Sequence, residues 1–86
     1  MGKTIVIFKI TASDMEKLES IAKAIPKIKS GEVKDVKRQP IGFGIEVIRA
    51  AILIPEKQDA VLDAVTKELQ QIPNVEEVEV ESMTLL

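Results

Sequence analysis

The sequence predicts an α+β fold in which a four-stranded antiparallel sheet carries two helices on one face. Six hydrophobic segments follow one another in the order strand, helix, strand, strand, helix, strand. The first and third strands are apolar along most of their length and suit the interior of a sheet, whereas the second and fourth are charged and suit its edges. Together these observations indicate a ferredoxin-like βαββαβ sandwich with the strand order 4-1-3-2. The 86 residues suit one domain, residues 1–86.

The first strand and first helix differ in the period of their hydrophobic residues. The segment "KTIVIFKI" is β-branched and almost continuously apolar, as expected of a central strand. In residues 11–28 the apolar positions then recur every three or four residues, which indicates an amphipathic helix. Ser13 followed by Glu16 fits a capping box at its start, and Pro26 should end the regular helix near Ala24–Ile25.

The second and third strands are separated by a glycine-rich turn. Residues 32–40 are rich in lysine, with Val33 and Val36 as the apolar positions, and we expect an edge strand there. Residues 45–55 are mostly apolar and end at Pro55, which indicates a second central strand.

A second helix and a fourth strand complete the chain. Residues 56–72 show one apolar stripe, and the Pro73-Asn74 pair should stop the helix. Alternation of glutamate and valine over residues 77–81 predicts an edge strand with one wet face and one buried face.

The composition removes most classes of catalytic chemistry. The chain has no histidine and no cysteine, so disulfides, thiol chemistry and histidine-based catalysis or zinc binding are excluded. Its serines have no histidine base and no nucleophile-elbow context. We therefore expect a protein that is not an enzyme and needs no cofactor. Glu77, Glu79 and Glu81 share a predicted strand face, which leaves weak metal binding open, although such a row is ordinarily a solvated surface.

Charge is distributed unevenly along the chain, although the net charge is only −2. Residues 1–50 carry ten basic and six acidic side chains, and residues 51–86 carry two basic and eight acidic ones. A polarised surface can orient a charged partner, and it can equally serve only solubility. Direct nucleic-acid binding is not expected, because Lys34, Lys37 and Arg38 have no group of aromatic side chains beside them on which bases could stack.

The turn "PIGFGI" holds Phe43, one of only two phenylalanines, between two glycines. It lacks the spacing of a phosphate-binding loop and precedes a strand, not a helix. Two interpretations remain open from the residues alone. Phe43 could fold back onto its own core, or it could stay exposed as an aromatic anchor for a partner.

Residues 40–69 carry a family resemblance. "PIGFGI", followed by an alternating strand and an acidic helix, resembles the guanine-nucleotide exchange domain of translation elongation factor 1-beta, and the whole chain resembles its compact archaeal form. The resemblance implies a factor that promotes release of GDP from elongation factor 1-alpha and its loading with GTP. The partner would be the GDP-bound GTPase.

The same resemblance implies which residues bind that partner. The phenylalanine of this loop enters a pocket of the GTPase near its switch region, which would be the role of Phe43. Pro40, Ile41, Gly42 and Gly44 would shape its presentation. Eukaryotic members also use a penultimate lysine at the magnesium region. Here Leu85 and Leu86 end the chain, so displacement of Mg²⁺ by a tail ammonium group is not expected.

The sequence also leaves an alternative function and predicts a location. Many ferredoxin-like domains are small regulatory or ligand-binding modules that dimerise through the sheet, and such a module would pack Phe43 internally. No signal peptide and no apolar run long enough to cross a bilayer is evident, so we expect a cytoplasmic protein without a membrane partner.

Overall fold

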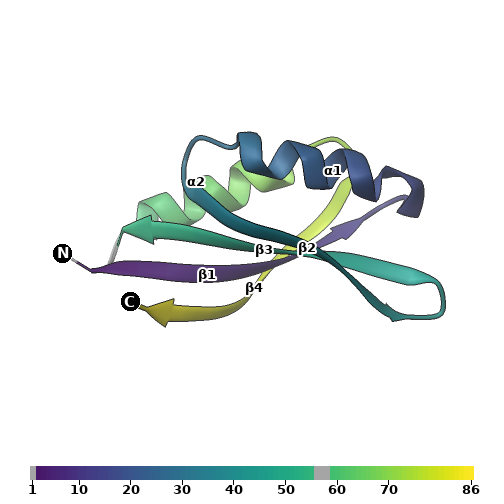
Figure 1. Ribbon diagram of the computed structural model, residues 1–86. Helices are drawn as coiled ribbons and strands as arrows, with labels where there is room; N and C mark the ends of the chain where they lie inside the picture. The colour runs from purple at the N-terminus through teal and green to yellow at the C-terminus, as the bar shows by residue number, and fades with distance from the viewer. Residues whose placement is uncertain (1, 56–58) are drawn as a thin grey trace.

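The protein is described by a computed structural model of residues 2–55 and 59–86. The strands are β1 (Lys3–Ala12), β2 (Glu32–Gly42), β3 (Ile45–Pro55) and β4 (Val75–Leu85). The helices are α1 (Leu18–Ala24), flanked by the 3₁₀ turns η1 (Met15–Lys17) and η2 (Ile25–Lys27), and α2 (Asp59–Gln70). The sheet is antiparallel with the order β2-β3-β1-β4, and both helices cover one face (Figure 1). This order is the predicted 4-1-3-2 read from the other edge.

The core lies between the sheet and the two helices. Alternate residues of β1 and β3 face the helices, among them Phe8 and Ile52, which are fully buried. Helix α1 contributes Leu18 and Ile21, and α2 contributes Val65 and Leu69. The predicted central strands therefore have an apolar core on one face.

The ends of the two helices agree with the predicted stop signals, whereas one predicted start signal differs from the structure. Helix α1 ends at Ala24, and Pro26 lies in the 3₁₀ turn that follows, where its missing N–H is tolerated. The predicted capping box at Ser13 is wrong. The cap is Asp14, whose carboxylate accepts a hydrogen bond from the backbone N–H of Glu16, while the Ser13 hydroxyl donates to the Asn74 carbonyl oxygen.

Helix α2 ends at Gln70, before the predicted Pro73-Asn74 stop. Asn74 adopts a positive φ of 72°, a conformation that asparagine tolerates better than most residues. The predicted first residues of this helix, 56–58, lie outside the described residues. No helix among those described has the length and apolar character of a membrane span.

The edge strands β2 and β4 contain irregular pairings that change which side chains face the core. In β2, Val33 pairs with Ile52 and Asp35 with Ala51, so Lys34 is an extra residue. Val33 and Val36 are three residues apart, yet both pair with residues of β3 that face the helices, and both pack against the core. A strand alternates its side chains with a period of two, so this placement requires a bulge.

Strand β4 also contains a bulge, at its centre. Phe8 pairs with Val80 and Ile7 with Ser82, which leaves Glu81 extra. The simple alternation predicted for residues 77–81 therefore does not continue along the strand. Its prediction of a buried face is only partly right, because Val78 packs against the core but Val80 is 44% exposed.

Candidate functional site

The β2–β3 hairpin extends beyond the rest of the sheet. The last pair between β1 and β3 joins Ile10 to Ile48, so residues 45–47 of β3 pair only with β2. In Figure 1 the hairpin reaches the end of the molecule opposite both chain termini. Its tip is therefore flanked by solvent on both sides and not by neighbouring strands.

The tip is a two-residue turn with an uncommon backbone. Gly42 pairs with Ile45, and Phe43 and Gly44 connect them. The φ angles are 109° at Gly42, 56° at Phe43 and 73° at Gly44. Positive φ at both connecting residues is what a type I′ hairpin turn requires, and it favours Asn or Asp before Gly. A phenylalanine in this conformation is a rare choice on steric grounds.

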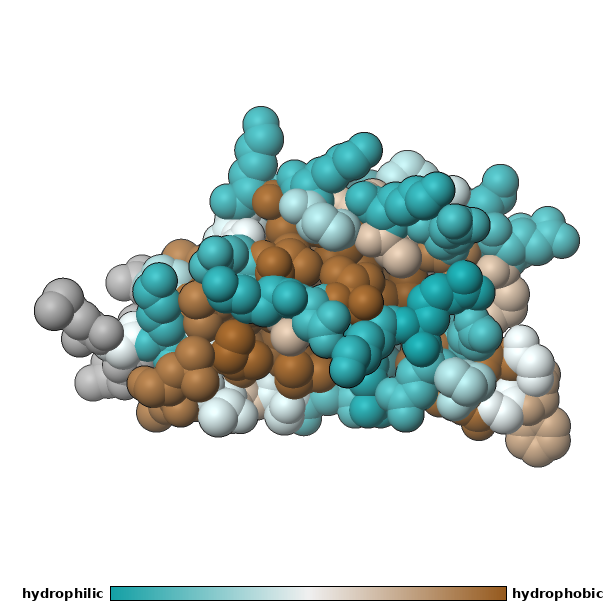
Figure 2. Space-filling view, viewed as in Figure 1, coloured by the Kyte–Doolittle hydropathy of each residue, from teal (hydrophilic) through white to brown (hydrophobic). Residues whose placement is uncertain are grey.

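The Phe43 side chain is fully exposed, with a relative accessibility of 103%. The interpretation in which Phe43 folds back onto its own core is therefore wrong. Phe8, the other phenylalanine, is fully buried under the helices. Figure 2 shows hydrophobic side chains projecting at the end of the molecule where the hairpin lies.

Two isoleucines flank the ring. Ile41 is 52% exposed and Ile45 is 42% exposed. Ile45 was not among the predicted site residues, although it is the last residue of the "PIGFGI" motif, which was the signal available in the sequence. Pro40 is exposed on the edge strand opposite Glu46, where its missing N–H disturbs the sheet least.

The base of the hairpin is held by polar contacts. The Arg38 guanidinium donates to Glu46 Oε2 from Nε at 3.0 Å and from Nη2 at 2.7 Å. The backbone N–H of Glu46 points at the Met15 sulfur, 3.4 Å away. These contacts link both strands of the hairpin and connect β3 to η1, just before the exposed tip begins.

The predicted tail residues lie at the opposite end of the sheet. Leu85 pairs with Thr4, and the Leu86 N–H donates to the Lys3 carbonyl oxygen at 2.8 Å. Lys3 in turn pairs with Pro55, the last residue of β3, whereas Ile45 begins that strand at the tip. At about 3.3 Å per residue, the length of β3 separates the two sites by roughly 30 Å. Leu85 and Leu86 are 65% and 73% exposed, but the structure does not bring them to Phe43.

The basic residues of the edge strand β2 are paired with carboxylates. Lys34 lies 3.2 Å from Glu32, Lys37 lies 3.6 Å from Asp35, and Arg38 bonds Glu46. Phe8 is buried in the core and offers no ring to a base. The absence of direct nucleic-acid binding stays a prediction.

The acidic residues of β4 do not form a metal site within the described residues. Glu79 lies 3.8 Å from Lys9, and Glu81 lies 3.0 Å from Nε of Arg49, which reaches across β1. A hydrogen bond with Glu79 and repulsion between the two carboxylates raise the pKa of Glu77. Two of the three glutamates thus have cationic neighbours.

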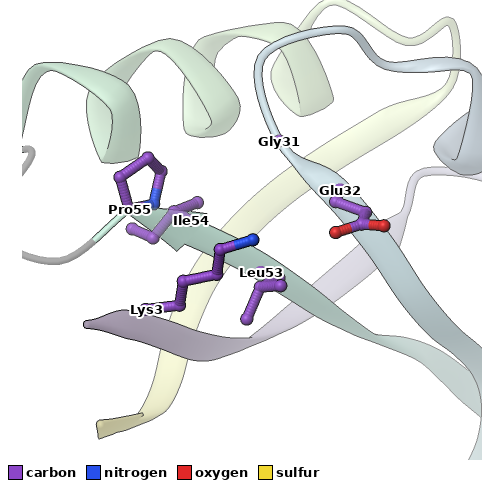
Figure 3. A pocket seen from close by; sticks show the side chains of 6 residues that line it. All are labelled: Lys3, Gly31, Glu32, Leu53, Ile54 and Pro55. Atoms are coloured by element: carbon purple, nitrogen blue, oxygen red, sulfur yellow. The ribbon is translucent and has the colours of Figure 1, made fainter. Parts of the chain in front are cut away.

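Two hollows open on the sheet of the described residues. One, of about 210 Å³, is lined by Lys3, Gly31, Glu32, Leu53, Ile54 and Pro55 (Figure 3). The other, of about 290 Å³, lies on the helix-free face and is lined by Ile7, Asp35, Lys37, Gln39, Arg49 and Ala51. The first hollow combines Lys3 and Glu32 with apolar residues, and the second combines three charged residues and Gln39 with Ile7 and Ala51.

Solved structures with a similar fold show the architecture alone. The ACT domain from the GTP pyrophosphokinase of Chlorobium tepidum matches with a TM-score of 0.65 at 14% identity, covering 91% of this chain and 97% of that one. The de novo designed protein Foldit4 matches with a TM-score of 0.66 at 22% identity, covering 95% and 96%.

Sequence relatives are more informative. Elongation factor 1-beta of Methanocorpusculum labreanum is 34% identical, covering 100% of this chain and 99% of the relative. The protein of that name from Methanoculleus marisnigri is also 34% identical over the whole of both chains, and the one from Staphylothermus marinus is 30% identical over 96% of each. The model of the EF-1 guanine nucleotide exchange domain matches residues 5–86. With its protruding hairpin and nearly full-length match, this chain belongs to the EF-1 guanine nucleotide exchange domain family.

Proposed function

We propose that the chain binds the GDP-bound form of elongation factor 1-alpha through Phe43 and weakens the hold of that GTPase on its nucleotide. Its family makes it a guanine nucleotide exchange factor for elongation factor 1-alpha. The proposal concerns which residues carry the exchange and which form of the GTPase they meet. The observation that supports it most strongly is the complete exposure of Phe43 at the tip.

The hairpin tip has two features that do not favour the stability of the fold. The exposed ring of Phe43 contributes no burial free energy to the fold. The backbone φ of 56° at Phe43 is strained for a residue with a large side chain. Local choices that disagree with stability are expected at functional sites. A partner that buries the ring explains both features at once.

Exchange requires differential binding and no bond-making residue. A factor that binds the GTPase better when the nucleotide contacts are disrupted must weaken GDP, and GDP must weaken the factor by the same amount. Typical couplings are about 1–3 kcal/mol. Burial of one large apolar side chain supplies roughly 1.5–3 kcal/mol, so the ring of Phe43 has a free energy of the required order.

The alternative, a regulatory module that dimerises through its sheet, predicted an internal Phe43. The observed exposure and the family both favour exchange. Size-exclusion chromatography with light scattering is expected to show a monomer. The cytoplasmic location stays a prediction, and we propose it because translation factors act where ribosomes work.

The test is the effect of Phe43→Ala on nucleotide release. Elongation factor 1-alpha from the same organism is loaded with a fluorescent GDP analogue, and release is followed by stopped flow with excess GTP. We expect the wild-type chain to accelerate release and the variant to lose most of that acceleration. Circular dichroism and thermal unfolding should be unchanged, because the ring touches no core residue. An unchanged acceleration in Phe43→Ala would contradict the proposal.

A further inference from the structure

We infer that Ile41 and Ile45 form, with Phe43, one apolar contact surface that sets the affinity for the GTPase, and that this surface fits an uncharged apolar pocket. The inference rests on the proposed function, because it deepens the same site. It assigns different roles to neighbouring side chains. The ring drives exchange, and the isoleucines hold the complex together.

The exposed large hydrophobic side chains of the described residues gather in two places. One group, Val80, Met83, Leu85 and Leu86, lies on β4 and its end, and the other is the hairpin tip. At the tip, six consecutive residues from Pro40 to Ile45 have no polar side chain. A run of that length at an exposed position is unfavourable for a soluble surface unless it has a function.

The structure leaves both isoleucines without a facing side chain in the hairpin ladder. Ile45 pairs with Gly42, which has no side chain, and a Cβ placed on Gly42 would meet no atom within 4 Å. Ile41 lies at the irregular pairing between Pro40 and Gly42 and has no partner in the ladder. Facing side chains normally stabilise a hairpin through such pairs. Here the tip leaves that contact area free.

The shape of these side chains suits them to affinity. Isoleucine is branched at Cβ and restricted at χ1, so it loses little freedom when a partner covers it. Ile41 belongs to β2 and Ile45 to β3, the two strands that the turn with its two positive-φ glycines joins. A polar or charged surface would bury them without compensation, so the matching site on the GTPase must be apolar.

The experiment compares Ile41→Thr, Ile45→Thr and the double variant with Val80→Thr. Threonine keeps the branch at Cβ and the preference for strands, so the hairpin should persist. Val80 is the matched control because it is a β-branched residue of similar exposure, 44%, on the opposite edge strand. Release of the fluorescent GDP analogue is measured over a range of factor concentrations for each variant.

We expect each tip substitution to raise the factor concentration at half-maximal stimulation by about three- to tenfold. This is the effect expected when one partly exposed aliphatic contact is lost. The maximal release rate should be unchanged. The double variant should show roughly the product of the two shifts, and Val80→Thr should match the wild type.

Three outcomes would overturn the inference. Half-maximal concentrations equal to that of the wild type would remove the contact role of the isoleucines, and the proposed function would stand if Phe43→Ala still abolished exchange. A shift of the same size in Val80→Thr would show a general surface effect. A wild-type chain without any stimulation of release would overturn the proposed function and the inference together.

Discussion

The conformation of Phe43 sets its proposed function against stability at a single residue. Its φ of 56° lies in the left-handed region, where a residue with a Cβ costs about 1–2 kcal/mol. Asparagine is the preferred residue for the first position of such a turn. The chain has phenylalanine there, and its ring makes no compensating contact with the core.

Phe43→Asn is therefore expected to stabilise the protein while it removes exchange. The free energy of unfolding in urea should rise by about 0.5–1 kcal/mol, because asparagine relieves the strain of the turn. Stimulated GDP release should fall as far as in Phe43→Ala. The alanine variant is the control, since it removes the ring without improving the turn. A less stable Phe43→Asn protein would show that the ring supports the hairpin.

At the scale of elements, the bulges decide how the edge strands meet the core. Val33 and Val36 in β2 are three residues apart, as are Val75 and Val78 in β4. In a regular strand the members of each pair would face opposite ways. One extra residue between them returns both to the side of the helices, where all four pack against the core. Bulges also make an edge strand a poorer template for pairing with another chain.

The connection from η2 to β2 approaches the core closely at Gly31. A Cβ at this position would lie 2.7 Å from Cγ2 of Ile52 and 3.0 Å from Cγ2 of Val65. Both neighbours are fully buried, so neither has room to move. A glycine is required at position 31 because the space beside β3 and α2 does not admit a Cβ.

Gly31→Ala is expected to destabilise the fold by about 1–3 kcal/mol, the usual cost of overpacking. Thermal unfolding should show a lowered Tm. Exchange at temperatures well below unfolding should remain, because the hairpin tip lies elsewhere in the structure. The matched control is Ala22→Gly on α1, which removes a methyl group where Gly31→Ala adds one. A Gly31→Ala protein as stable as the wild type would mean that Ile52 and Val65 can move apart.

At the scale of the whole molecule, Glu68 joins helix α2 to the connection between α1 and β2. Its carboxylate accepts hydrogen bonds from the Lys29 N–H at 2.9 Å, from the Ser30 N–H at 3.1 Å and from the Ser30 hydroxyl. The hydroxyl bond is the main cause that lowers the pKa of Glu68 below its ordinary value of 4.5, and the backbone bonds add to it. The ionised form is the one that holds the two segments together.

A lowered pKa gives stability that is present above the ordinary value of 4.5 and is lost as the pH falls through the value in the folded state. Glu68→Gln is therefore expected to cost about 1 kcal/mol at pH 7, an amount limited by the partial exposure of the group. Its penalty should shrink as the pH falls below 4.5. Asp63→Asn, which changes an exposed carboxylate on the same helix, is the control. A penalty that does not change with pH would contradict this role of the charge.

The two ends of the sheet separate the proposed contacts. Leu85 and Leu86 lie beside Lys3, at the end of the molecule far from Phe43. At that distance the tail and the hairpin tip are separate surfaces, and the proposed function assigns exchange to the tip.

Removal of Leu85 and Leu86 is expected to reduce exchange less than Phe43→Ala does. Stopped-flow release of the GDP analogue compares the two variants at equal concentration. Thermal unfolding serves as the control, since the truncation removes the bond from Leu86 to Lys3. Complete loss of exchange in a folded truncated protein would show that GDP release depends mainly on the tail and not on the hairpin.

The sequence by itself determined the order of the elements, the two central strands and the exceptional position of Phe43. These properties follow from local patterns: hydrophobic period, proline and glycine positions, and the shortage of aromatic residues. Ile45 was missed because a residue at the start of an apolar strand has the same pattern whether it is buried or exposed.

Only the tertiary structure decided which apolar residues stay outside. Exposure depends on neighbours that are distant in sequence. Ile45 is exposed because β1 ends its pairing at Ile48 and because its partner across the hairpin is a glycine. The bulges of β2 and β4 depend in the same way on how segments meet in space, and so do the bond from Ser13 to Asn74 and the hydrogen bonds of Glu68. A periodic pattern records the preference of each segment for a buried face, and packing determines how far that face is covered.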